Sequence, residues 1–289
     1  MGFLINEMPS MKWYHGKRAV ITGGSSGIGK AVAEWLVSWG ADVCILARNV
    51  PRLEETLKAL QQKKRFSHQK IIAFSCDVTS AQEVQKTAEK TIETFGGIDL
   101  LINSAGNTHP GYFIQLPHAI FQDLMEVNFM GTVHCIRAFL PYFLKQKQGH
   151  IANISSILGF MGIFGYTAYS ASKFALLGFS QSLRQELLPY HIQISVCFPP
   201  DTDTPMLQKE NQYKPEETQL LAGKIRPMSA RVVALQLLKG IQRGKFVIVP
   251  GFLSKLSYFL YHHFSFLLWG ILDGELKKYY SRKEKSVYQ

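Results

Sequence analysis

The chain has 289 residues, of which 46% are hydrophobic, and its formal net charge at pH 7 is +11. This length suits one α/β domain with a buried core and an additional segment. The basic residues gather around 58–70 and 277–285 rather than in one arginine-rich, aromatic-interleaved patch, which argues against nucleic-acid binding. No His/Cys cluster has metal-ligand spacing. The cysteines form no C-x-x-C pair, which indicates buried thiols in a reducing compartment.

Apolar segments of strand length alternate with segments of helical periodicity along most of the chain. The expected strands cover residues 18–21, 42–47, 71–75, 100–103, 150–155, 192–198 and 246–249, and the expected helices cover 31–39, 53–64, 81–95, 121–146 and 168–188. Continuous apolar strands that alternate with helices are typical of a parallel sheet covered on both faces. Right-handed crossovers then give a doubly wound α/β sheet of about seven strands, with its ligand crevice at the carboxyl ends of the strands.

The first expected strand runs directly into a glycine-rich turn and a helix. Gly23 permits a sharp turn, Gly27 permits close approach of a ligand, and Gly29 permits close packing of the helix. Because a helix N-terminus attracts anions, we predict that this turn holds the phosphates of a cofactor, through Gly23, Ser25, Ser26, Gly27, Ile28 and Gly29. The alternatives are a turn without a ligand and a G-x-S-x-G hydrolase elbow, which normally lies later in its domain.

Polar and small residues follow the next three expected strands. Arg48, with Arg52 one helical turn further on, provides a cation where a ribose 2′-phosphate needs one, which favours NADP(H) over NAD(H). Asp77 can accept a hydrogen bond from an adenine amino group or cap the following helix. The small residues after 100–103 allow the backbone to lie against a ribose. The predicted cofactor contacts therefore include Arg48, Arg52, Asp77, Val78, Asn103, Ala105 and Gly106.

The fifth expected strand ends in a pair of serines, and Tyr169 and Lys173 follow on one face of a helix. An ammonium near a phenol favours the phenolate, so we expect Lys173 to lower the pKa of Tyr169 by roughly 1–3 units. The hydroxyl of Ser156 can hold a substrate carbonyl. Ser155 is the weaker candidate because its side chain points to the opposite face of the strand.

Taken together, these motifs resemble the short-chain dehydrogenase/reductase family over residues 17–250, and imply a Rossmann-type fold. The resemblance implies that Tyr169 protonates the substrate oxygen, that Lys173 also binds the nicotinamide ribose, and that Ser156 orients the carbonyl. It implies that Asn128 holds a water of a proton relay. Family members form dimers or tetramers through helices corresponding to 121–146 and 168–188.

The stretch 198–218 is similar to one NADPH-dependent branch of this family, which reduces a long-chain amino-ketone in sphingoid-base synthesis. The resemblance places Pro199, Thr202 and Thr204 against the nicotinamide, in a substrate lid over 201–228. An apolar substrate channel is expected from Phe160, Phe164, Met206 and Leu207, for which ordinary loop packing is the alternative. A steroid or retinoid oxidoreductase, or a non-catalytic NADP(H)-binding protein, are the competing functions.

The two ends of the chain differ from the expected reductase domain at 17–250. Residues 1–16 form a polar lead without the apolar region of a signal peptide. Residues 251–289 form an apolar segment and a basic tail, and no formal charge lies between Lys255 and Asp273. We expect an in-plane or hairpin anchor on an anionic membrane, with a helix packed on the domain as the alternative. The catalytic domain would face the cytoplasm, at the endoplasmic reticulum in a eukaryote, or at the inner membrane or in the cytoplasm of a bacterium.

Overall fold

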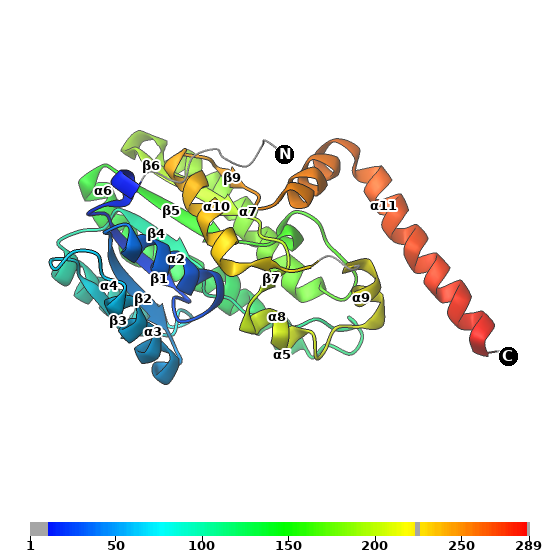
Figure 1. Cartoon of the computed structure of the whole chain (residues 1–289). Helices are drawn as coiled ribbons and strands as arrows, with labels where there is room; N and C mark the ends of the chain where they lie inside the picture. Colours follow the sequence, from blue (N-terminus) through cyan, green and yellow to red (C-terminus); the bar gives the residue numbers. More distant parts are fainter. Residues whose placement is uncertain (1–10, 223–225, 288–289) are drawn as a thin grey trace, which may run out of the picture.

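The computed structural model describes residues 11–222 and 226–287 and builds them around a parallel sheet (Figure 1). Its seven strands lie in the order β3-β2-β1-β4-β5-β6-β9, and every pairing is parallel. The strand positions predicted from apolar segments are confirmed. The strands are β1 (Arg18–Thr22), β2 (Asp42–Ala47), β3 (Ile71–Ser75), β4 (Leu100–Asn103), β5 (Gly149–Ile154), β6 (Ile192–Cys197) and β9 (Val247–Ile248).

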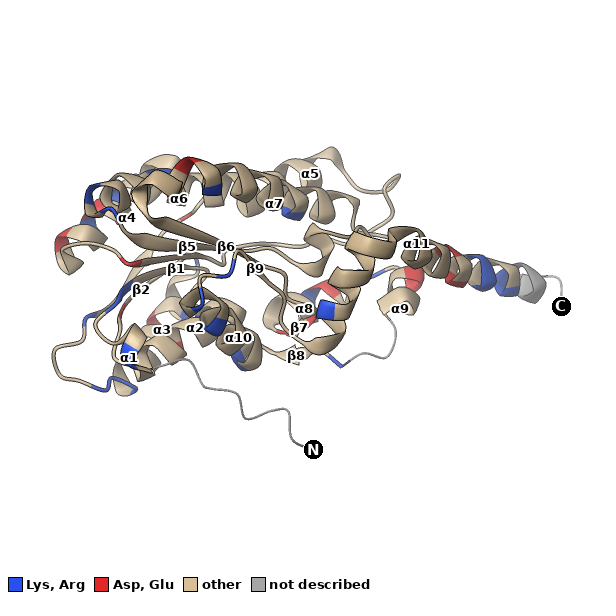
Figure 2. Cartoon of the chain, turned by 90° about the horizontal axis from the view of Figure 1, so that it is seen from above, with Lys and Arg blue, Asp and Glu red and all other residues tan. Residues whose placement is uncertain are grey.

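Helices cover both faces of the sheet, as Figure 2 shows in a view along its layers. One face carries α2 (Gly27–Ser38), α3 (Val50–Gln62) and α10 (Ala230–Gln242), and the other carries α4 (Ala81–Phe95), α6 (Gly131–Gln146) and α7 (Thr167–Leu187). Neighbouring residues of one strand serve opposite faces: Ile21 packs in the core with α2 and α10, whereas Val20 packs in the core with α4 and α6. The doubly wound α/β fold is therefore confirmed.

Three features of the helices and termini differ from the expectations. The helix expected over 121–146 is α5 (His118–Met125), a π-helical turn (Glu126–Met130) and α6 in succession. Helix α10 was not predicted. Tyr14, on the short helix α1 (Met11–Tyr14) within the expected lead, is fully buried, and its hydroxyl donates to the carbonyl of Leu238 at 2.5 Å. The four cysteines are buried free thiols, as predicted.

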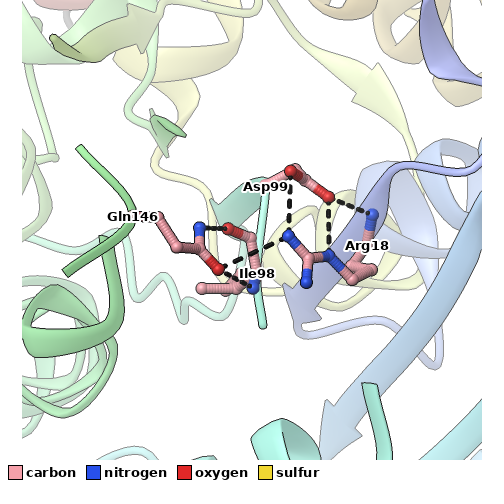
Figure 3. A network of polar contacts seen from close by, with 4 residues as sticks. All are labelled: Arg18, Ile98, Asp99 and Gln146. Atoms are coloured by element: carbon pink, nitrogen blue, oxygen red, sulfur yellow. Dashed lines mark hydrogen bonds and ion pairs between the residues drawn. The ribbon is translucent and has the colours of Figure 1, made fainter. Parts of the chain in front are cut away.

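A polar network joins the amino ends of β1 and β4, the ends away from the predicted crevice (Figure 3). The guanidinium of Arg18 donates to Asp99 through Nε at 2.9 Å and Nη2 at 3.2 Å, and Gln146 holds both backbone groups of Ile98. Partial burial opposes ionisation of Asp99, but the hydrogen bonds from Arg18 outweigh it and hold the pKa below its usual range. This network fixes the two central strands, so that their carboxyl ends are held in register.

The segment after β6 forms a small layer over the carboxyl ends of the strands. It contains the strand pair β7 (Thr202–Asp203) and β8 (Met228–Ser229) and the helices α8 (Pro205–Glu210) and α9 (Glu216–Ala222). The chain ends in α11 (Phe252–Val287), which is bent at Phe264, where the backbone is not helical. The bend divides the apolar segment of residues 252–272 into two helical parts. Within the residues that the structure describes, no helix combines the length and hydropathy that a membrane crossing requires.

Candidate active site

A cleft lies at the carboxyl ends of the central strands, where a doubly wound sheet places its ligands. Four parts of the chain line it: the glycine turn after β1, the loop after β4, the end of β5 with the first turns of α7, and the segment after β6. The predicted site residues that line it are Gly23, Ser26, Gly27, Ile28, Ala105, Gly106, Ser156, Tyr169, Lys173, Pro199, Thr202, Thr204, Met206 and Leu207.

The glycine positions of this turn leave little space for a side chain. Gly23 and Gly27 have φ of +64° and +53°, a region that favours glycine. A Cβ on Gly29 would lie 2.5 Å from the carbonyl oxygen of Gly23, and a Cβ on Gly23 would lie 2.9 Å from the backbone of Ala105. The turn therefore packs closely against its own helix at Gly29 and against the loop after β4 at Gly23. A Cβ on Gly27 would meet Thr204, at 3.0 Å.

The N-terminus of α2 opens into this cleft. Ser26 is the N-cap residue with an extended backbone, and its side chain makes no capping hydrogen bond, so the hydroxyl can serve a ligand. Ser25, which was predicted beside it, does not line the cleft. Its side chain is buried and its carbonyl accepts a hydrogen bond from Thr56 at 3.2 Å. A turn that only glycine fits, beside the N-terminus of a helix, suits a phosphate-bearing cofactor.

Thr22 joins the end of β1, where the glycine turn begins, to the loop after β4. It was not among the predicted site residues. Its buried hydroxyl oxygen accepts from the backbone N–H groups of Ser104 and Ala105, both at 3.0 Å. Its position at the carboxyl end of β1, where a doubly wound sheet places site residues, could have indicated this role. Asn103 acts similarly: its amide donates to Asn153 at 2.9 Å inside the sheet. Asn103 thus does not line the cleft, in contrast to Ala105 and Gly106.

Arg48 follows β2 and Asp77 follows β3, and their side chains meet at the carboxyl ends of these two strands. Arg48 Nη1 lies 3.4 Å from Asp77 Oδ2. Asp77 Oδ1 accepts from the backbone N–H and hydroxyl of Thr79, and Ser80 caps α4. The alternative that Asp77 is the N-cap is therefore wrong. Burial opposes ionisation of Asp77, but the hydrogen bonds from Thr79 and the nearby Arg48 lower its pKa.

Two further cofactor predictions lie beside this pair. Arg52 is in the first turn of α3, where its backbone N–H donates to Asn49 Oδ1 at 3.0 Å. Val78 is buried, and its carbonyl is 3.0 Å from His134 Nδ1. Their contacts to a cofactor stay predictions.

Ser156, Tyr169 and Lys173 come together in the cleft. Ser156 begins the turn after β5, and its hydroxyl accepts from the backbone of Leu158 at 3.2 Å. Lys173 Nζ lies 5.7 Å from the ring centre of Tyr169 and donates to the carbonyl of Ile154 at 3.0 Å. The hydroxyl of Ser155 instead donates to the Lys173 carbonyl at 3.0 Å, so Ser155 braces α7.

The electrostatics of this group differ from the expectation in one respect. Burial raises the pKa of Tyr169 and the nearby Glu210 raises it further, while a hydrogen bond with Ser156 acts in the opposite direction. Burial also lowers the pKa of Lys173, to about 8. The expected lowering of the Tyr169 pKa is thus wrong for these surroundings, because desolvation and nearby carboxylates raise it. Tyr169 keeps its proton near neutrality, which is the form that a general acid needs.

Asn128 lies in the π-helical turn and is fully buried. Its amide donates to the Asn107 carbonyl at 3.0 Å and to Ser172 Oγ at 2.9 Å, and its Oδ1 accepts from Asn107 N at 2.7 Å. Asn128 therefore braces the loop after β4 against α7. A Cβ on Gly106 would lie 3.1 Å from Asn128 Oδ1 and 3.4 Å from Lys173 Nζ, so this loop approaches both side chains closely. A water held by Asn128 stays a prediction.

Hydrogen bonds to the turn after β5 and within the segment itself hold the segment after β6 at the cleft. Pro199 accepts a hydrogen bond from the N–H of Ile157 at 3.1 Å, next to Ser156. The hydroxyl of Thr202 donates to the Pro200 carbonyl at 2.7 Å, and the hydroxyl of Thr204 caps α8. These contacts hold Met206 and Leu207 at the cleft wall.

The two phenylalanines expected in the substrate channel lie elsewhere. Phe160 is 1% exposed and packs against Phe198 and, with ring centres 5.0 Å apart, against Tyr258 of α11. Phe164 contacts Tyr112 edge to face. Neither phenylalanine lines the cleft. Helix α11 covers Phe160, a contact that the local sequence does not reveal, and the place of both residues in a substrate channel stays a prediction. In their place, Tyr166, Asp201 and Glu210 line the cleft.

Comparisons with known proteins agree with this geometry. The family model for short chain dehydrogenases matches residues 17–215. The chain is 38% identical over 232 residues to the 3-ketodihydrosphingosine reductase of Bos taurus, covering 80% of this chain and 70% of that protein. It is 37% identical over 255 residues to the 3-ketodihydrosphingosine reductase of Dictyostelium discoideum, covering 83% and 76%.

A solved structure of a short chain dehydrogenase/reductase from Burkholderia phymatum in complex with NAD is also similar. Its TM-score is 0.77 at 26% identity, covering 88% of this chain and 96% of that one. Levodione reductase has a TM-score of 0.74 at 25% identity, covering 82% and 96%. The chain therefore belongs to the short-chain dehydrogenase/reductase family of oxidoreductases.

Proposed function

We propose that this protein is an NADPH-dependent reductase that converts 3-ketodihydrosphingosine to dihydrosphingosine. The observation that carries the proposal is the meeting of Ser156, Tyr169 and Lys173 in the cleft beside the glycine turn. The substrate is supported by relatives at 37–38% identity that bear the name of this reductase. The apolar Met206 and Leu207 at the cleft wall suit a long alkyl chain.

The residues of the cleft fit a nicotinamide dinucleotide. The side-chain-free turn at Gly23 and Gly27, and the uncommitted hydroxyl of Ser26, suit the pyrophosphate. Arg48 would bind a ribose 2′-phosphate, which selects NADP(H). When bound, the nicotinamide supplies the hydride that reduces the carbonyl carbon. Lys173 would hold the nicotinamide ribose through the ammonium that already contacts the Ile154 carbonyl.

The side chains of the cleft supply the remaining chemistry. The hydroxyl of Ser156 donates a hydrogen bond to the substrate carbonyl and orients it. Tyr169 transfers its proton to the same oxygen as the carbon receives the hydride, so that the ketone becomes a secondary alcohol and the phenol becomes a phenolate. Because burial and Glu210 raise the pKa of Tyr169, the phenol is protonated before each reduction. Lys173 stabilises the phenolate that forms.

A panel of ketones tests this assignment. Purified protein with NADPH should consume the cofactor with 3-ketodihydrosphingosine and show little activity with a steroid ketone or a retinal. A preference for the steroid or the retinal would instead favour the alternative within the family. NADPH binding without turnover of any ketone would favour a non-catalytic protein.

We further propose that residues 17–250 form the reductase domain, with a lid over 201–228 of which 223–225 lie outside the described residues, and that α11 docks on a membrane surface. Apolar side chains are exposed along this helix, and Figure 2 shows basic residues toward its end. The exposed apolar residues are Phe252, Leu253, Leu256, Phe259, Phe264, Phe266, Leu267, Trp269 and Ile271. An aromatic-rich surface next to lysines suits an anionic membrane interface. The catalytic domain would then face the cytoplasm. Assembly into dimers or tetramers stays a prediction.

Vesicle sedimentation tests the docking. The protein should sediment with vesicles that contain phosphatidylserine, and a double variant, Phe266→Asp with Ile271→Asp, should remain in the supernatant with unchanged reductase activity on a short soluble ketone. Equal sedimentation of the two proteins would contradict docking through α11.

A further inference from the structure

Three charged side chains and a tyrosine form a network in the same cleft as Tyr169. Glu210, at the end of α8, accepts a hydrogen bond from the hydroxyl of Tyr166 at 2.6 Å and pairs with Lys214 Nζ at 2.8 Å. Asp201 lies 3.6 Å from the same ammonium. The side chains of Glu210 and Lys214 are only 9% and 6% exposed, so this pair is largely removed from water, whereas Asp201 is half exposed.

The network carries more negative than positive charge. Two carboxylates share one ammonium, which leaves one formal negative charge, and both carboxylates line the cleft whereas Lys214 does not. Lys173 is the other charged residue of the lining, and its Nζ is held by the carbonyl of Ile154 rather than by either of these carboxylates. Because two carboxylates face the cleft and one ammonium outside its lining offsets them, this part of the cleft favours a ligand with a positive charge.

The network is close to the reacting groups. The rings of Tyr166 and Tyr169 have centres 5.9 Å apart, so the carboxylate that Tyr166 holds lies one ring away from the proton donor. Glu210 and Asp201 line the same cleft as Tyr169, and after burial their charges add to the rise of its pKa. A cation bound here would therefore lie next to the carbonyl that Ser156 and Tyr169 hold.

We propose that Glu210, assisted by Asp201, binds the ammonium group that a sphingoid-base ketone carries on the carbon beside its carbonyl. This inference rests on the proposed function, because that amino-ketone is the substrate proposed above. A primary amine is protonated near neutrality, so it supplies the charge that the network lacks. Steroid and retinoid carbonyl compounds have no such group, and Glu210 thereby determines specificity rather than the chemical step.

A pair of ketones tests the inference. We would compare 3-ketodihydrosphingosine with the ketone of equal chain length that keeps the 1-hydroxyl and lacks the amine. Glu210→Gln should lower kcat/KM for the amino-ketone about tenfold or more, mainly through KM, as expected for loss of a charge-assisted hydrogen bond. An effect of the variant through Tyr169 acts on both ketones alike, so the loss for the amine-free ketone should be at least about threefold smaller than the loss for the amino-ketone, because Gln can still accept from Tyr166.

Two further variants complete the comparison. Asp201→Asn should give a smaller loss in the same direction, since its side chain is half exposed. Asp203→Asn removes an equal charge from an exposed neighbour outside the cleft and should leave both ketones unaffected. If Glu210→Gln fails to fold, Asp201→Asn decides alone.

Equal losses on both ketones would overturn the inference and make Glu210 a structural group of the lid. An unchanged preference for the amine in both variants would overturn it as well. Failure of the proposed function would be visible earlier, in the unmodified protein: no turnover of the amino-ketone would remove both proposals before any variant is compared.

Discussion

Replacing Arg48 by Gln is expected to weaken NADPH binding about 5- to 30-fold and to leave NADH binding unchanged. The guanidinium lies 3.4 Å from Asp77, with the two side chains 59% and 32% exposed. An ion pair this exposed contributes about 0.2–1 kcal/mol, whereas a charge-assisted hydrogen bond contributes about 1.5–3 kcal/mol. Exchanging Asp77 for a 2′-phosphate thus gains about 1–2 kcal/mol, which corresponds to the stated loss of affinity.

Calorimetric titration with both cofactors measures this difference. Arg65→Gln, an exposed arginine beyond the far end of α3, is the matched control and should bind both cofactors normally. Asp77→Asn should strengthen NADPH binding a fewfold, because a competing carboxylate is removed. Equal weakening of both cofactors by Arg48→Gln, or no weakening of either, would refute the assignment of Arg48 to a 2′-phosphate.

Two other predictions concern the turn and the core. Gly29→Ala should reduce affinity for either cofactor at least about tenfold, because the new Cβ lies 2.5 Å from the Gly23 carbonyl oxygen and overpacking costs about 1–3 kcal/mol. The control in the same titration is Gly270→Ala, whose new Cβ has no atom within 4 Å. Burial lowers the pKa of His150 to about 4 from 6.5. Its contribution to the free energy of unfolding is complete above pH 6.5 and should fall by about 3 kcal/mol toward pH 4. Urea denaturation of His150→Gln should lack this part of the pH dependence, and an identical pH dependence in both proteins would contradict the assignment.

The sheet could be predicted because each of its strands is a local apolar segment. Val20 and Ile21 are apolar neighbours that serve opposite faces, which only a strand covered on both sides requires. The π-helical turn at Glu126–Met130 could not be predicted, since it depends on the contacts of Asn128 with a distant loop and with α7. The path of α11 likewise depends on tertiary packing, through Tyr258 on Phe160.

The candidate site was predictable where function follows from spacing along the chain. Tyr169 and Lys173 share a helix face, and Gly23 and Gly29 share a turn, so the sequence places each pair together. The sequence did not indicate that Glu210 lies beside Tyr166 and that Phe160 lies outside the cleft, because these positions depend on how the segment after β6 and α11 fold back. The direction of the Tyr169 pKa shift depended on burial and, after it, on the same carboxylate, neither of which the sequence revealed.

The protein is proposed to reduce 3-ketodihydrosphingosine with Tyr169 as the proton donor. The direct test compares this reaction in the unmodified protein and in Tyr169→Phe. NADPH consumption is followed by absorbance, the product is identified by mass spectrometry, and cofactor binding is measured in parallel. We expect dihydrosphingosine in equal amount to the NADPH consumed, and a rate about 10²–10⁴-fold lower for Tyr169→Phe with cofactor affinity unchanged. No dihydrosphingosine from the unmodified protein, or full activity without the Tyr169 hydroxyl, would contradict it.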